Sequence, residues 1–467
     1  HALLFASNSF TMWEDRITLG MVCLVLVVRA WMGLGAPLTR WQQQIPIISI
    51  LALLLLRFAG MSRVCREEQA PYCAPSFYAY QATTKFADNP AYALSGPATN
   101  SPYALAAAYL FAFAMADILR RILKPSHAHL SSASTLLTWI IRPALLGSSG
   151  FWLADWVHGL EQLDEATRST FLVIKIWTAR AVLFLLVAGA WYWYLSPLSL
   201  SVLREPTQKR DAPPKVALLG FGNTFGAAFL LFTSLAFSLL FLLSQPMGQL
   251  ALSACFVAMV LIAELGDYEC DARLLAASKM PNTKDLSASP THAPSLLEIV
   301  CIGLIGFVAF FSTGHQATFT AIQWRVAFVG FPVVTYPWSP LFVVLNAFGP
   351  LSILPAFGVV LLTLWNVAPT RAKVQQEETG HVRPMRLPGD ILRSALGLLL
   401  YVGVLTWSAA LWAWFFRRHL MLFKIWVPRY MMAGMGLLIT DVALLGAVAV
   451  AWWIAARTAK AFGTLYT

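Results

Sequence analysis

Long runs of apolar residues, separated by short polar stretches, repeat along the whole chain. A window of about 19 residues, the length at which a helix crosses the hydrocarbon core of a bilayer, finds roughly eleven such runs. They are residues 17–35, 45–60, 102–122, 136–153, 170–194, 216–243, 249–266, 296–311, 341–365, 391–416 and 431–455. The pattern predicts an all-α, polytopic membrane helix bundle of about 11 transmembrane helices, with residues 1–467 forming one transmembrane domain.

Composition supports a membrane protein and changes how the net charge is interpreted. The chain has 467 residues, of which 58% are apolar and 12% are charged, which is too apolar for a soluble protein of this size. A net charge of +11 would indicate nucleic-acid binding in a soluble protein. In a membrane protein it is typical of loops that face an anionic cytosolic leaflet, so we expect no nucleic-acid partner.

The distribution of Lys and Arg predicts which loops face the cytosol. Loops 36–44, 120–131, 195–215, 267–294, 366–390 and 456–467 together hold 17 of these residues, and the alternate set of loops holds 10. Because positive charge concentrates on the cytosolic side, the first set is expected there and the second set in a lumen. The luminal set includes 61–100, where Cys65 and Cys73 bracket a loop rich in charge and proline. An oxidising lumen makes these two cysteines a predicted disulfide.

A dense polar cluster ends the run 296–311 and leads into an aromatic stretch. It contains His315 and Gln316, and Trp324 begins the series of rings that favours a membrane–water interface. One interpretation is a polar re-entry at the membrane surface that contacts lipid or glycan. The other is an ordinary interfacial loop, and the residues alone leave both open.

Four basic residues of the luminal set lie in one short loop, which departs from the charge trend. Arg417, Arg418 and Lys424 alternate there with aromatic residues, close to His419. Guanidinium groups beside a membrane face can bind the oxygen pairs of a phosphate, so the loop is a candidate for capture of a lipid or glycan headgroup. Snorkelling of Arg and Lys from helix ends is the alternative.

An acidic cluster lies at the first predicted helix. Asn8, Glu14 and Asp15 face the same lumen and are candidates for holding an ammonium group, such as that of ethanolamine. The alternative is a capped helix start, with acidic residues near its positive end. If both clusters bind, the membrane part offers separate sites for the two charges of a zwitterionic lipid.

Ionisable residues within the apolar runs are candidates for structural ion pairs or for an ion pathway, since burying one unpaired costs roughly 2.5 to 3.5 kcal/mol at mid-membrane. Structural pairing is the favoured interpretation for most of them. They are Arg29, Arg57, Arg142, Lys175, Arg180, Arg393, Glu264, Glu298 and Asp441.

Four sequence runs carry a resemblance to a known family. They are Ser312-Thr-Gly-His-Gln316 followed by Ala321-Ile-Gln-Trp324, Ser7-Asn-Ser-Phe10 with Trp13-Glu-Asp15, Gly220-Phe-Gly-Asn-Thr-Phe-Gly226, and Arg417-Arg-His-Leu-Met421. Together they resemble the transmembrane half of the glycosylphosphatidylinositol (GPI) ethanolamine-phosphate transferases, in particular the member that acts on the third mannose.

The resemblance implies an activity in the endoplasmic reticulum membrane. In the family, a luminal domain similar to alkaline phosphatase uses a Thr nucleophile and two zinc ions to move ethanolamine phosphate from phosphatidylethanolamine to a mannose of the GPI precursor. This sequence contains no such domain and no metal-ligand constellation, so it is expected to be a fragment, with catalytic residues and zinc outside it. The resemblance further implies a small hydrophobic stabilising subunit as partner.

Three other functions remain open at this stage. A sister transferase for the first or second mannose would differ in the glycan that it accepts. A lipid transporter or scramblase would concentrate charges at mid-membrane. A non-catalytic membrane scaffold would tolerate loss of Arg417 and Arg418 without loss of activity.

Overall fold

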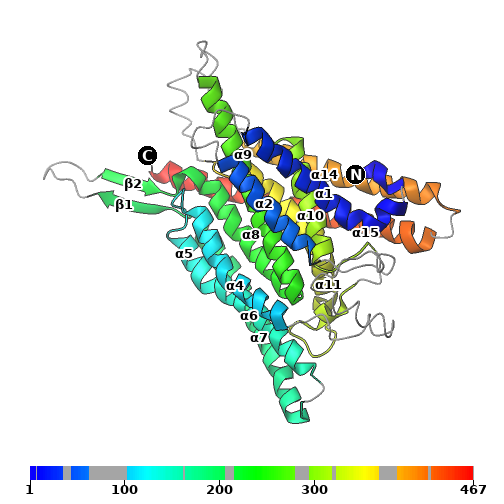
Figure 1. Ribbon diagram of the computed structural model, residues 1–467. Coiled ribbons are helices and arrows are strands. Elements are labelled where there is room, and N and C mark those ends of the chain that lie inside the picture. Colours follow the sequence, from blue (N-terminus) through cyan, green and yellow to red (C-terminus); the bar gives the residue numbers. More distant parts are fainter. Residues whose placement is uncertain are drawn as a thin grey trace.

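The structure is a computed structural model of the chain, and it describes residues 1–6, 8–34, 44–62, 102–160, 163–205, 215–278, 294–317, 322–367, 387–418 and 422–465. Its main elements are long helices that run side by side in one bundle (Figure 1). In its first half lie η1 (Ala2–Ala6), α1 (Asn8–Leu34), α2 (Gln44–Gly60), α4 (Pro102–Leu123), α5 (Ser132–Leu136), η5 (Leu137–Ile141), α6 (Arg142–His158), α7 (Glu165–Leu195), β1 (Ser201–Glu205), β2 (Lys215–Leu219) and η6 (Phe221–Asn223). In its second half lie α8 (Thr224–Leu243), α9 (Pro246–Ser278), α10 (Leu296–Ser312), η9 (Trp324–Phe328), α11 (Trp338–Phe348), η10 (Gly349–Ile353), α12 (Leu354–Leu364), α14 (Leu387–Phe415), η11 (Leu422–Trp426) and α15 (Val427–Leu465).

The predicted class, an all-α membrane bundle, is confirmed, whereas the count of about 11 crossings is not. Seven helical stretches of the described chain are long and apolar enough to cross a membrane. Two shorter apolar helices, α2 and α10, accompany them. A single antiparallel hairpin, β1 with β2, is the strand structure in the described residues.

The helices divide into a buried centre and a periphery. In α9, 94% of the most apolar window is buried, compared with 17% in α7. A helix that is apolar on every side packs inside a bundle, and Phe237 of α8 stacks on Phe256 of α9 with 4.4 Å between ring centroids. The large side chains exposed on α7, such as Phe184 and Trp191, are those that a bilayer would cover.

Two of the long stretches are interrupted by a π segment next to a proline. η10 carries Gly349 and Pro350 between α11 and α12, and η5 is followed by Pro143 in α6. Proline has no N–H to donate to the preceding turn, so the local hydrogen-bond pattern shifts there. The η10 segment turns Leu351 and Ser352 toward the interior cavity described below.

Several ionisable side chains inside the bundle form ion pairs, which confirms the structural interpretation for them. Arg29 of α1 lies 3.2 Å from Glu298 of α10, and its Nε lies 3.5 Å from Glu269 of α9. Arg142 lies 2.5 Å from Asp117, the carboxylate of a neighbouring helix. Lys175 of α7 lies 2.9 Å from Asp155 of α6. Paired in this way, these charges hold helices together rather than marking an open ion route.

Candidate functional site

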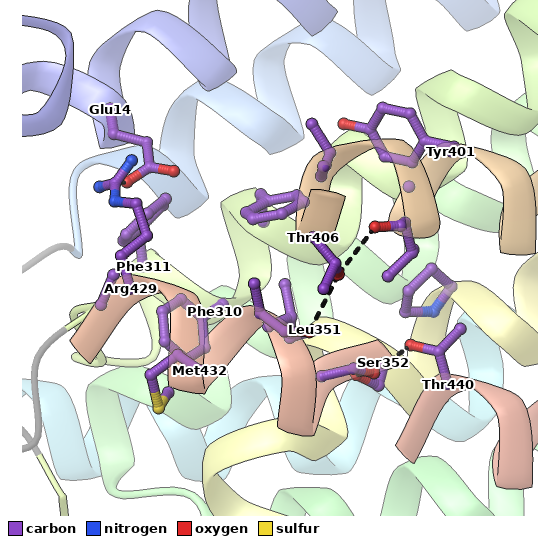
Figure 2. A pocket seen from close by; sticks show the side chains of 18 of the residues that line it. Glu14, Phe310, Phe311, Leu351, Ser352, Tyr401, Thr406, Arg429, Met432 and Thr440 are labelled. Carbon is purple, nitrogen blue, oxygen red and sulfur yellow. Dashed lines mark hydrogen bonds and ion pairs between the residues drawn. The ribbon is translucent and has the colours of Figure 1, made fainter. Parts of the chain in front are cut away.

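An apolar cavity lies between α10, η10, α14 and α15 (Figure 2). Its walls are formed by rings and aliphatic side chains, including Phe307 and Phe311 from α10 and Leu398 and Leu405 from α14. Met432 closes it from α15. An apolar lining of this kind suits a small apolar ligand or part of a lipid chain.

A buried ion pair lies at one end of the cavity. Glu14 of α1 and Arg429 of α15 both line it, and an Arg429 Nη2–H donates to the Glu14 carboxylate. Only 3% of Glu14 and 5% of Arg429 is exposed. The Arg429 guanidinium also lies over the Phe5 ring, 4.8 Å from its centroid. Figure 2 shows the two charged side chains beside each other, with the apolar wall extending away from them.

Tyr401 connects to this pair through the imidazole of His1. Nδ1 of His1 lies 2.9 Å from the Tyr401 hydroxyl, and Nε2 lies 3.9 Å from the Glu14 carboxylate. Tyr401 packs against the backbone of α10 at Gly303, where a Cβ would come within 2.7 Å of the Tyr401 ring. The absence of a side chain at Gly303 therefore fixes how closely α14 approaches α10.

The Ser and Thr hydroxyl groups of the cavity wall donate to backbone carbonyls. Ser352 and Thr440 both donate to the Gly436 carbonyl, at 3.1 and 2.7 Å. Thr406 donates to the carbonyls of Val402 and Ala433, at 3.0 and 3.2 Å. Because these donors are used, the wall presents an apolar surface, and the buried pair is the charged feature of the cavity.

His315 lies in a buried structural network beside the cavity, not among its lining residues. Nδ2 of Asn346 donates to the Leu243 carbonyl at 2.8 Å, which turns its Oδ1 toward Nε2 of His315 at 3.0 Å. Since that oxygen only accepts, Nε2 carries the proton, and Nδ1 lies 3.0 Å from the Thr313 hydroxyl. Burial lowers the pKa of His315 to about 4, so the ring is neutral at pH 7.

The structure disperses the other predicted site residues of this stretch. Gln316 is partly buried, and 65% of Trp324 is exposed. Gln323 donates to the Thr313 carbonyl at 2.8 Å, which ties the segment back to the end of α10. Contact of His315, Gln316 or Trp324 with lipid or glycan remains a prediction.

Arg417 and Arg418 are exposed just beyond the end of α14. The Arg417 guanidinium lies 5.1 Å from the centroid of the Trp414 ring, a cation–π contact that fits a helix end at an interface. His419, Cys65 and Cys73 lie outside the described residues, as do the side chains of Asn8 and Lys424. Asp15 is buried next to Glu14.

Sequence reasoning counted Arg429 among the basic residues of the luminal loop but did not select it. The signal was its immediate context, because Trp426, Val427 and Pro428 precede it without another charge. Trp426 is almost fully buried, which draws the start of α15 inward with Arg429. The cation nearest the cavity is therefore this residue rather than Arg417 or Arg418.

The cavity does not fit a catalytic metal. Within the described ranges, no group of three or more His, Cys, Asp or Glu side chains comes together. The carboxylate at the cavity, Glu14, is engaged by Arg429. A zinc ion needs three or four converging donors, so no step through a metal can be assigned to these residues.

The bundle and its cavity define a multi-pass, all-α membrane protein with an interior apolar site. The chain is 27% identical to GPI ethanolamine phosphate transferase 3 of Eremothecium gossypii, in an alignment of 481 positions that covers 95% of the chain. It is equally 27% identical, over 94% of its length, to the protein of that name in Saccharomyces cerevisiae. A human relative, GPI ethanolamine phosphate transferase 3, catalytic subunit, is 28% identical over 55% of the chain and 25% of its own length.

These relatives confirm the family resemblance found in the sequence. The chain is a relative of the GPI ethanolamine phosphate transferases, and the curated proteins that it matches carry the name of the third enzyme. It spans 42% of the length of the two fungal relatives. No family model and no solved structure matches it.

Proposed function

We propose that this chain is the membrane module of an enzyme that moves ethanolamine phosphate from phosphatidylethanolamine to a mannose of the GPI precursor, with the third mannose as the acceptor. The names of the relatives support this, together with the multi-pass bundle. The proposal includes about eleven membrane crossings, a location in the endoplasmic reticulum and a small hydrophobic stabilising subunit. The Thr nucleophile and zinc ions of the reaction would belong to a domain outside this chain.

The observation that carries the role of the module is the cavity with its buried pair. An apolar wall suits an acyl chain, and a phospholipid that enters from the bilayer would bring its headgroup to Glu14 and Arg429. Phosphatidylethanolamine carries a phosphate anion and an ammonium cation. The planar guanidinium of Arg429 can bind the phosphate, and the Glu14 carboxylate can bind the ammonium. When the lipid binds, the ion pair between Glu14 and Arg429 would open, and each residue would pair with one charge of the headgroup.

The exchange keeps the buried charges compensated throughout. Removing one partner of a buried ion pair costs about 3 to 5 kcal/mol, because the other charge is then left alone in a medium of low polarity. A zwitterionic headgroup offers both countercharges at once, whereas an anionic lipid offers only a phosphate. The site would therefore favour zwitterionic over anionic phospholipids.

A lipid transporter or scramblase is a less well supported function. It would use charged residues at mid-membrane, whereas Arg29, Arg142 and Lys175 are held in ion pairs that join neighbouring helices. A non-catalytic scaffold would leave the cavity without a role. Transfer measured in variants of the cavity wall separates these functions.

The test uses the full-length protein with its luminal part, in vesicles that contain labelled phosphatidylethanolamine and a GPI precursor. Gly436→Leu adds a side chain at the cavity wall, where Leu351 and Ser352 are the neighbours. Excluding two methylenes of a lipid chain costs about 1.6 kcal/mol, or roughly a 15-fold loss in kcat/KM. Gly446→Leu is the matched control, since nothing lies within 4 Å of its Cβ position on the same helix.

Transfer that falls in Gly436→Leu but not in Gly446→Leu supports the lipid role of the cavity. Equal transfer by both variants, at equal abundance, rules out that role. Absence of transfer in the unmodified full-length protein would instead contradict the proposed reaction.

A further inference from the structure

Asp441 is an acidic residue far from both ends of α15. It lies 12 residues after Arg429 and 16 residues before Arg457, which at 1.5 Å per residue is about 18 Å and about 24 Å along the axis. The hydrocarbon core of a bilayer is about 30 Å thick, so the carboxylate lies near its middle.

The side chain emerges on the outer face of the helix. Leu438 and Leu445, three residues before and four residues after, are 56% and 72% exposed, and Trp452 on the same face is 50% exposed. At Gly434, one heptad before Asp441, a Cβ would meet nothing within 4 Å. Residues at these spacings line one side of a helix, so Asp441 belongs to a surface of α15 that the other described residues leave uncovered.

No hydrogen-bond donor within the described chain satisfies this carboxylate. Oδ1 of Asp441 is shielded by the chain itself and has no hydrogen-bond partner there. A helix packed on the outer face would therefore donate to Oδ2, the oxygen that the chain leaves accessible. The other charges discussed above differ, because Arg29, Arg142 and Lys175 each have a carboxylate within 3.2 Å. An acidic group at mid-membrane costs roughly 2.5 to 3.5 kcal/mol on insertion scales unless a donor reaches it.

We propose that this face of α15, formed by Gly434, Leu438, Asp441, Leu445 and Trp452, docks a transmembrane helix of another polypeptide that carries a hydrogen-bond donor at mid-bilayer depth. Lipid chains can cover the leucines but cannot donate to the carboxylate. An amide or ammonium side chain on a facing helix can, and Gly434 lets the two backbones approach closely. The expected occupant is an apolar helix that carries a hydrogen-bond donor, and its docking does not depend on the transferase activity.

The neighbouring helix extends the surface. α14 packs against α15, as the hydrogen bond from Thr406 to the Ala433 carbonyl shows, and both run along one side of the bundle in Figure 1. Leu396, Leu400, Val404 and Trp407 follow one another at helical spacing on α14 and are each 45% or more exposed. A partner helix seated at Asp441 would therefore have a second apolar ridge within reach.

The experiment uses the full-length protein in lipid nanodiscs and three synthetic transmembrane peptides. Each peptide is a leucine helix of about 20 residues, with a central Asn, a central Lys or no polar residue. A photoreactive phenylalanine analogue replacing Leu445 captures bound peptide covalently. The same analogue replacing Phe184, which is 74% exposed on α7, is the matched control for nonspecific collision.

The expected result at position 445 is capture of the Asn and Lys peptides with about threefold to twentyfold higher affinity than the all-leucine peptide. Asp441→Leu abolishes the preference. Asp441→Asn retains the preference for the Asn peptide, because its amide oxygen still accepts, but loses most of the preference for Lys. If Asp441→Leu does not fold, the Asp441→Asn comparison decides alone.

Equal capture of the three peptides at position 445 overturns the proposal and leaves lipid as the occupant. So does an unchanged preference in Asp441→Leu, or equal capture at positions 184 and 445. A covalent dimer of the protein itself at position 445, without peptide capture, assigns the face to a second copy and also overturns it.

Discussion

Glu14 and Arg429 are 415 residues apart in the sequence and form a buried ion pair. The contact joins the beginning of α1 to the beginning of α15, and both side chains line the same cavity. The effect of this ion pair on stability can be measured separately from its proposed role in lipid binding. Stability depends on whether one charge is left unpaired, whereas lipid binding would need both charges.

For stability, we predict that Arg429→Gln lowers the free energy of unfolding by about 3 to 5 kcal/mol, since it strands a buried carboxylate. The double variant Glu14→Gln with Arg429→Gln removes both charges, so its free energy of unfolding should fall by clearly less than that of Arg429→Gln. Thermal unfolding in detergent measures both. A double variant less stable than Arg429→Gln would contradict the pair as the source of the effect.

The pKa of His315 predicts a pH dependence of stability. Its pKa falls from an unfolded value of about 6.5 to about 4 in the folded protein, so protonation favours the unfolded state. Above pH 6.5 the group has no effect, and stability is lost as the pH falls through the window from 6.5 to 4. The loss should reach about 3 kcal/mol below that window. Chemical unfolding followed between pH 7 and pH 4 measures it.

The matched control for this prediction is His127→Gln, because His127 is exposed in the turn after α4. Its pH profile should follow that of the unmodified protein, whereas His315→Phe should flatten the acid limb. An acid limb that persists unchanged in His315→Phe would assign the effect to other groups.

Close packing of α10 and α14 predicts the effect of a methyl group at Gly303. Gly303→Ala brings a Cβ within 2.7 Å of the Tyr401 ring, so the ring, whose hydroxyl contacts His1, must shift. We expect a loss of about 1 to 3 kcal/mol in unfolding free energy. Gly403→Ala, on α14 where nothing lies within 4 Å, should instead gain up to about 1 kcal/mol from helix propensity. Equal effects of the two variants would contradict the packing argument.

Arg417 and Arg418 are exposed, so both can be replaced without disturbing the packing of the interior. If they capture phosphate, replacing both with Gln should lower phosphoethanolamine transfer by the full-length protein several-fold and weaken its dependence on salt. Surface substitutions of this kind change unfolding free energy by about 0.5 kcal/mol or less. Unchanged turnover at normal abundance would leave only the snorkelling interpretation.

The predicted disulfide between Cys65 and Cys73 requires that the loop 61–100 faces the lumen. A membrane-impermeant thiol reagent added from the cytosolic side should label neither Cys65 nor Cys73 in sealed vesicles. After the vesicles are opened, labelling should appear only once a reductant is added. Labelling in sealed vesicles would place this loop on the cytosolic side and reverse the charge argument.

The apolar pattern predicted the bundle well but misplaced the region around residue 216. Residues 216–219 are apolar and were assigned to a helix, whereas they form β2 and the helix begins at Thr224. A short apolar run has no periodicity that separates strand from helix. Gly220 ends the strand with a φ of +88°, a conformation in which a side chain would also meet the Ser199 carbonyl.

Two glycines four residues apart, at 222 and 226, have the spacing of a close helix contact, but only Gly226 packs against a neighbouring segment. A Cβ there would lie 2.9 Å from the Leu364 carbonyl, while Gly222 has nothing within 4 Å. Spacing along one helix cannot say which face meets a neighbour. The sequence is limited in the same way at the cavity. Glu14 is recognisable as part of an acidic cluster, but its partner Arg429 is recognisable only from the packing of α1 against α15.

The π segment at Gly349–Ile353 sets the rotational phase of α12 relative to α11. Each residue of an α-helix turns the chain by about 100°, so deleting one residue there would rotate every later position of α12 by that angle. Val359 and Leu362, now almost fully buried, would swing out of the interior and other side chains would replace them. The π segment therefore sets which side chains of α12 face the interior, independently of those of α11. One continuous apolar stretch can in this way pack against neighbours that lie in two different directions.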